Sequence, residues 1–348
     1  ILVLQREVAR EIARQAEVPL AGSRGRKPRR VGPEAYRHFL RGRQQLYRFH
    51  SGGYAAAVDE FGAALEREPE YAAVYAWRGM AYSGLAFSTS SPGRPGEYAE
   101  LARASAERAL ELDPQLGVAH AVIAWQTFAH DWDFARAERL YRDALEIDPN
   151  NWWLHWGYAE LLSALGRHDE AIARINKAHE IDPVNPLVEV ERTAVYNHAG
   201  QYQKALKVVD RALEVMPNHQ ELHDRRIGIL EHLDRFAQAI DTRERYGLVV
   251  KREYDAVAHR QAWKEYGERG YWQWLLEDPG WTTGKVPRAR VRARLGHEAE
   301  AFDLLAQAIQ ERHPASVYIG VHPEFKSLAN HPRFQQLLQK IGLPSDPE

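Results

Sequence analysis

Two short motifs in the sequence have the residue types and the spacing of known chemical sites. His219 and His223 lie four residues apart, which on a helix places two imidazoles on one face, where they could bind a metal ion. The glutamate of a zinc-peptidase helix is absent, because position 220 is Gln220. Residues 280–286 read GWTTGKV and are similar to a phosphate-binding loop, but one spacer residue is missing and Val286 replaces the required serine or threonine. We therefore expect structural histidines here, no metal ion and no cofactor.

Other residue types that carry out catalysis are absent or scattered. The chain has no cysteine, which excludes disulfides, thiolate metal sites and cysteine nucleophiles. Carboxylates such as Glu107, Glu111 and Asp113 lie near predicted helix ends, where their charge is solvated. No paired acids and no serine nucleophile motif occur. The sequence therefore predicts no catalytic site, and we do not expect an enzyme.

Charge and hydropathy exclude two further classes of protein. The 46 Lys and Arg residues nearly balance the 48 Asp and Glu residues, whereas a nucleic-acid binder usually needs a strongly basic face. No apolar run approaches the roughly 18–20 residues of a membrane span. The chain starts at Ile1 without Met or a cleavable signal, which indicates a portion of a longer protein. We expect a cytoplasmic location, and a periplasmic one remains open.

A repeat organises most of the chain. Similar hexapeptides such as ALELDP, ALEIDP, AHEIDP and ALEVMP recur at steps of 34 or 35 residues. They end at Pro114, Pro149, Pro183 and Pro217. An earlier copy ends at Pro69, and the longer step that follows it indicates a loop insertion at 86–97, which is rich in Ser, Pro and Gly.

Each repeat has the pattern of two antiparallel helices. Between 152 and 183, an amphipathic first helix ends at Gly166, where a left-handed backbone is expected. The second helix carries the small Ala171 and Ala178, which allow close helix packing, and Pro183 ends it. Small residues recur at the equivalent positions of four more repeats: Ala57, Ala64, Ala102, Ala109, Ala137, Ala144, Ala205 and Ala212.

The combination of Gly166, Ala171, Ile175, Ala178 and Pro183 at a 34-residue step resembles the tetratricopeptide repeat (TPR). This resemblance implies an all-α fold, a right-handed α-solenoid of about seven TPR-like helix hairpins with helical caps. It also implies a protein-interaction module in which a rigid concave groove binds a partner.

The flanking segments resemble a more specific group. Residues 4–13 and 34–43, and the C-terminal residues 321–325 and 331–334, are similar to the TPR region of bacterial multidomain regulators. In those proteins the TPRs follow a TolB-like segment behind a winged-helix, protein-kinase or adenylate-cyclase output domain. The resemblance implies the sensing or scaffolding part of a signalling or transcription regulator.

The pattern divides the chain into four parts. Residues 1–33 form an amphipathic helix and a basic linker, which either contacts phosphate or an acidic partner or is a solvated tether. Residues 34–250 contain six repeats. Residues 251–284 depart from the repeat as an irregular helix pair rich in aromatic residues, and 285–348 hold a last hairpin and the capping helices.

A binding groove is expected along the first helix of each hairpin, because these helices line the concave face of a solenoid. The predicted groove begins with aromatic side chains and ends with polar and acidic ones. Its residues are Trp77, Met80, Trp125, Phe128, Trp153, Trp156, Glu160, Asn197 and His198. Large exposed aromatics favour a bound peptide or helix.

Two alternatives to this groove remain open. The tryptophans could pack against neighbouring repeats, or against the N-terminal helix if that helix folds back into the groove. As a different function, the chain could sense a small molecule held between tryptophans near 86–97 or 263–281. An acidic chaperone tail is not expected, because the Lys, Asn and Arg of a carboxylate clamp are missing.

Overall fold

The computed structural model describes residues 31–47, 51–88, 95–250, 253–278 and 284–344. Within these ranges the chain is helical and has no strand. In chain order the helices are α2 (Pro33–Leu46), α3 (Ser51–Arg67), α4 (Ala72–Phe87), α5 (Pro95–Leu112), α6 (Gly117–Ala129), α7 (Phe134–Ile147), α8 (Trp152–Ala164), α9 (His168–Ile181), α10 (Pro186–His198), α11 (Tyr202–Val215), α12 (Gln220–His232), α13 (Phe236–Val250), α14 (Ala256–Glu277), α15 (Lys285–Arg294), α16 (Glu298–Gln310), the 3₁₀ helices η1 (Pro314–Tyr318) and η2 (Pro323–Leu328), and α17 (Pro332–Ile341). The predicted helix and linker at 1–33 lie almost entirely outside the described residues, as do half of the 86–97 insertion and most of the 280–286 motif.

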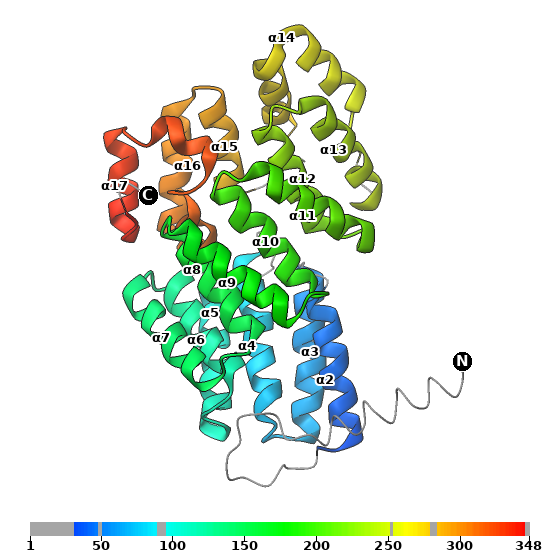
Figure 1. The fold of residues 1–348 in the computed structure, drawn as a ribbon, viewed down its shortest axis with the longest axis vertical. Coiled ribbons are helices and arrows are strands. Elements are labelled where there is room, and N and C mark those ends of the chain that lie inside the picture. The colour runs from blue at the N-terminus through cyan, green and yellow to red at the C-terminus, as the bar shows by residue number, and fades with distance from the viewer. Residues whose placement is uncertain (1–30, 48–50, 89–94, 251–252, 279–283, 345–348) are drawn as a thin grey trace, which may run out of the picture.

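Consecutive helices pair into hairpins, and the hairpins stack side by side (Figure 1). In the described ranges the pairs are α2–α3, α4–α5, α6–α7, α8–α9, α10–α11, α12–α13 and α15–α16. The first helices of successive hairpins also contact one another, from α2 through α12. This arrangement confirms the predicted all-α right-handed solenoid of about seven hairpins.

Local sequence explains where these helices begin and end. Gly166 and Gly200 have φ of 79° and 69°, which confirms the left-handed turn between the two helices of a hairpin. Asn151 and Asn185 cap the following first helices, because each side chain accepts a hydrogen bond at 3.0 Å from a backbone N–H two residues later.

The small residues of the second helices allow the hairpins to pack closely. All ten predicted alanines are at most 4% exposed, which confirms their place between the helices: Ala57, Ala64, Ala102, Ala109, Ala137, Ala144, Ala171, Ala178, Ala205 and Ala212. At these positions a larger side chain would push the two helices of a hairpin apart.

Helix α14 is a kinked pair rather than one straight helix. Gly267 has φ 62° and ψ −145°, outside the helical region, and the chain folds back at this point. A hydrogen bond of 3.0 Å between His259 Nε2 and the carbonyl of Tyr271 joins the two halves. Trp274 stacks on His259 with 4.3 Å between ring centroids, so this part of the aromatic-rich segment is filled by its own packing.

The C-terminal elements turn back onto the early repeats. Most buried apolar residues from Val286 to Leu343 belong to the same hydrophobic core as the first four hairpins and α10. In Figure 1 the orange and red elements α15–α17 lie next to the green helix α8. Arg312 donates a hydrogen bond of 3.0 Å to the carbonyl of His130, and its guanidinium lies 4.9 Å from the centroid of the Trp132 ring.

Candidate interaction groove

The concave wall is built from the first helices, and polar side chains connect each helix to the next. Gln126 on α6 donates to the hydroxyl of Ser83 on α4 at 2.8 Å. Trp125 on α6 donates its indole N–H to Glu160 on α8 at 2.7 Å. These bonds link each first helix to the next one along the wall.

The same connection continues toward the later repeats. Ser163 on α8 and His198 on α10 share a hydrogen bond of 2.9 Å between Oγ and Nδ1. Asn197 on α10 is joined to His232 on α12 by a 2.9 Å hydrogen bond between Oδ1 and Nδ1. The predicted groove residues Asn197 and His198 are therefore part of the wall, since both bond to a neighbouring first helix.

The chain itself covers the aromatic end of this wall. The 3₁₀ helix η1 contacts α4, α6 and α8, which are the first helices of three successive hairpins. Tyr318 at its end is only 7% exposed and donates its hydroxyl to Glu160 at 3.1 Å. Its ring meets Phe128 edge-on at 6.2 Å and stacks on His198 at 5.6 Å. The C-terminal segment thus lies where the sequence predicts a partner.

The predicted aromatic anchors are buried within the protein. None of the six predicted apolar groove residues is more than 8% exposed: Trp77, Met80, Trp125, Phe128, Trp153 and Trp156. Trp153 and Trp156 stack at 4.3 Å with an interplanar angle of 10°, and the Trp156 indole donates to the carbonyl of Leu187 at 3.2 Å. The guanidinium of Arg43 lies 4.4 Å from the Trp77 ring centroid. Their role in binding a partner stays a prediction.

Two buried carboxylates of the wall have a raised pKa. Burial raises the pKa of Glu160 to about 7, even though the hydrogen bonds from Trp125 and Tyr318 act in the opposite direction. Burial also raises the pKa of Glu191 on α10 well above its usual value, and the negative charge of Glu160 adds to this effect. This part of the wall therefore carries two carboxyl groups whose pKa is raised by burial.

The α12 end of the wall is open to solvent. Asp224 is exposed and accepts a hydrogen bond of 3.2 Å from the Tyr246 hydroxyl. Arg225 and Glu221 form an ion pair at 3.0 Å between Nε and Oε1, and both side chains are partly exposed. A partner would meet charged groups here, in contrast to the covered aromatic end.

A second buried network fixes the C-terminal elements to the later repeats. Glu324 on η2 accepts a hydrogen bond of 2.7 Å from Arg290 Nε on α15, and His232 Nε2 on α12 lies 3.2 Å from the same carboxylate oxygen. Burial acts to raise the pKa of Glu324, but Arg290 and His232 hold it well below its usual range. Sequence reasoning missed Tyr318, Arg290 and Glu324 as structural partners of the wall, because they lie outside the repeats that share a period.

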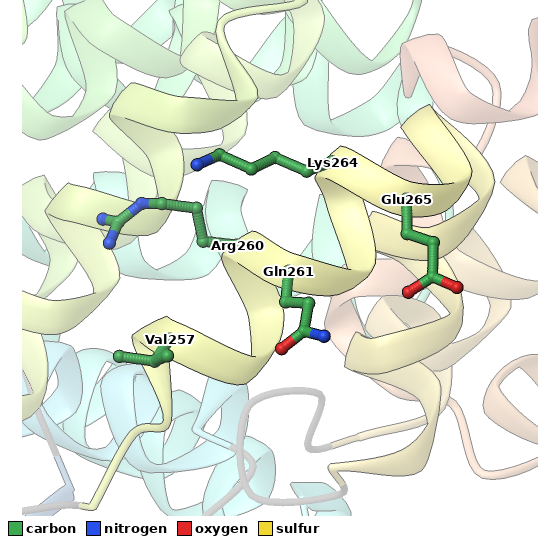
Figure 2. Close-up of a pocket in the computed structure, with 5 residues that line it drawn as sticks. All are labelled: Val257, Arg260, Gln261, Lys264 and Glu265. Carbon is green, nitrogen blue, oxygen red and sulfur yellow. The ribbon is translucent and has the colours of Figure 1, made fainter.

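The other candidate sites named from the sequence lie in ordinary packing. The His219 side chain accepts a hydrogen bond from the backbone N–H of Leu222, and His223 stacks on Tyr246 at 5.6 Å. No group of three or more metal-binding side chains occurs in the ranges that the structure describes. Figure 2 shows a shallow open depression on the first half of α14, lined by Val257, Arg260, Gln261, Lys264 and Glu265. All five residues come from one helix, so the depression is not enclosed.

Comparison with known proteins agrees with this geometry. Residues 131–189 match the model of the tetratricopeptide repeat family. No curated protein sequence matches the chain. Among solved structures, the APC/C hetero-tetramer Cut9-Hcn1 is similar over 94% of this chain and 59% of its own, with 15% identity and a TM-score of 0.54.

Two bacterial structures are also similar. A thermophilic TPR protein in Thermus thermophilus, TTC0263, shares 20% identity over 56% of this chain and 98% of its own, with a TM-score of 0.45. A TPR protein from Parabacteroides merdae shares 13% identity over 89% of this chain and 100% of its own, with a TM-score of 0.42.

The stacked hairpins define the chain as an α-solenoid. The family match within the third, fourth and fifth hairpins identifies their type: the chain carries tetratricopeptide repeats. No described helix is both long enough and apolar enough to cross a membrane.

Proposed function

We propose that the chain is a protein-interaction scaffold that binds a peptide or helix of a partner protein on its concave face. The TPR fold itself supports such a scaffold, because stacked hairpins present one continuous concave wall. The observation that carries the proposal is the seating of η1. A short segment of the chain lies across α4, α6 and α8 through one aromatic ring and one hydroxyl, which illustrates the kind of contact that this wall accepts.

The open half of the wall is the proposed place for the partner. It lies on α10 and α12, around Asp224, Glu221 and Arg225, whose side chains reach solvent. The predicted residues Asn197 and His198 belong to the same two-helix surface at its inner end. By resemblance, the context is a bacterial signalling or transcription regulator in the cytoplasm, with the output domain elsewhere. We propose neither an enzymatic activity nor direct binding of nucleic acid.

The proposal is tested with a randomised library of acetylated, amidated decapeptides. Peptides that bind should protect the backbone amides of α10 and α12 from hydrogen exchange and leave those of α11 and α13 unchanged. The substitution Asp224→Lys on the concave side should reduce binding at least tenfold. Its matched control, Glu214→Lys on α11, should not, because Glu214 is exposed on the second helix of the preceding hairpin. Protection confined to α11 and α13, or no binding peptide at all, would overturn the proposal.

A further inference from the structure

Glu191 on α10 is a buried carboxylate without a partner. Its side chain is 6% exposed, and it forms no hydrogen bond or ion pair with any other described residue. The other buried carboxylates of the wall are satisfied: Tyr318 and Trp125 donate to Glu160, and Tyr271 donates to Glu231 at 2.6 Å. Glu191 is therefore the carboxylate of the wall that has no donor within the described residues, and it is open to pairing with an incoming group.

The surroundings of Glu191 add negative charge instead of neutralising it. Glu160 on α8 and Glu221 on α12 both act on it as like charges. The cation that acts on it is Arg225, which is already engaged in the 3.0 Å ion pair with Glu221. Glu160, Glu191 and Glu221 therefore surround one guanidinium, that of Arg225, across α8, α10 and α12.

We propose that a cationic side chain of the partner segment, an arginine or a lysine, enters the concave face between α8 and α12 and pairs with Glu191. The inference rests on the proposed function and specifies the chemistry of its partner. A carboxylate without a donor is the complement of a group that has donors and no acceptor, and guanidinium and ammonium groups meet this description. Arginine fits best, because its planar fork can bind two carboxylate oxygens at once. A metal ion does not fit, since the described residues contain no cluster of metal ligands.

Binding of a cation has a measurable consequence for protons. Burial raises the pKa of Glu191 well above its usual value, so the folded protein favours the protonated carboxyl group more than free glutamate does. The charged and titratable groups that face it are Glu160 from α8, Glu221 and Arg225 from α12, and Tyr318 from η1. A guanidinium placed beside Glu191 lowers this pKa again, so the complex releases protons when it forms.

The experiment uses the decapeptides selected from the randomised library. Each arginine of a binding peptide is replaced by citrulline, which keeps the shape and removes the charge, and each lysine by norleucine. We expect one such replacement to weaken binding tenfold or more. Glu191→Gln should weaken the unmodified peptide by a similar factor and leave the modified peptide unaffected. Glu107→Gln on the outer helix α5 is the matched control and should change neither affinity.

Calorimetry at pH 7 in phosphate and in Tris measures the released protons. The binding enthalpy should differ between the two buffers for the unsubstituted chain and converge for Glu191→Gln. Glu191→Gln replaces one buried group by another of the same shape, and its melting temperature checks that the fold is retained.

The possible outcomes separate the two proposals. If no decapeptide binds, the proposed function itself fails. If peptides bind but neutral replacements at every basic position leave the affinity unchanged, the scaffold stands and the cationic partner is wrong. If L-arginine amide or spermidine binds as tightly as the selected peptides, the site takes free amines and a partner side chain is the wrong occupant.

Discussion

The seating of Tyr318 in the concave wall can be tested by removing its side chain. Tyr318 is buried, packs against Phe128 and His198, and donates to Glu160. Truncating a buried aromatic side chain costs about 3–5 kcal/mol, so Tyr318→Ala should lower the free energy of unfolding by that amount. Tyr318→Phe keeps the ring and removes one hydrogen bond. Because Glu160 keeps its bond from Trp125, this variant should lose about 1–1.5 kcal/mol.

Urea unfolding followed by circular dichroism measures both variants, and hydrogen exchange shows where the change occurs. If the solenoid unfolds in stages, exchange of the α6 and α8 amides still reports the local loss. The control is Tyr266→Ala, since Tyr266 is 65% exposed on α14 and its removal should change stability by no more than about 0.5 kcal/mol. If Tyr318→Ala behaves like this control and leaves α6 and α8 protected, η1 does not lie in the groove.

Three further predictions follow from the wall and the turns. Trp153→Ala and Trp156→Ala should each lower the free energy of unfolding in urea by about 3–5 kcal/mol. Because the two rings stack at 4.3 Å, the double variant should lose less than the sum of the single variants. Losses below about 1 kcal/mol would place the rings in a free groove instead. The pKa of Glu160 is raised from 4.5 to about 7, so the folded state binds a proton more tightly than the unfolded state does. Stability from this group is present at low pH and should fall by about 3 kcal/mol between pH 4.5 and 7, a slope that Glu160→Gln should remove. Gly200→Ala should lower the free energy of unfolding by about 1–2 kcal/mol, because φ is 69° there, although nothing lies within 4 Å of the added carbon. The control is Gly62→Ala, which is equally uncrowded but lies inside α3. Urea unfolding should show that this variant is stabilised.

The repeats could be predicted from the sequence because each hairpin contacts mainly its neighbours. The period, the closing prolines and the paired alanines describe contacts over one or two repeats, and a local pattern is sufficient to specify them. The positive φ at Gly166 and Gly200 follows from the same reasoning. The same reasoning did not predict the turns at Trp132 and Asp234, which adopt φ of 64° and 56° although neither residue is glycine.

The return of the C-terminal segment could not be predicted, because it joins residues far apart in the chain without any period. The hydrogen bond from Tyr318 to Glu160 spans 158 residues. Composition alone cannot distinguish an aromatic groove that waits for a partner from one that the chain fills itself. The alternative of self-occupancy named the N-terminal helix or neighbouring repeats; that helix lies outside the described residues, and η1 is the segment that contacts α4, α6 and α8.

The gradient from aromatic to acidic residues along the wall explains why one half is covered and the other is not. Covering aromatic rings with any apolar segment is favourable, because it removes apolar surface from water. A tethered segment of the same chain is therefore an effective occupant. The η1 segment gives Glu191 no donor, so this carboxylate is left for the proposed cationic partner. A partner long enough to reach α6 would have to displace Tyr318, and a cost of about 3–5 kcal/mol corresponds to roughly 10²–10⁴ in affinity. A partner confined to α10 and α12 avoids this cost, which favours a short basic segment over a long apolar one.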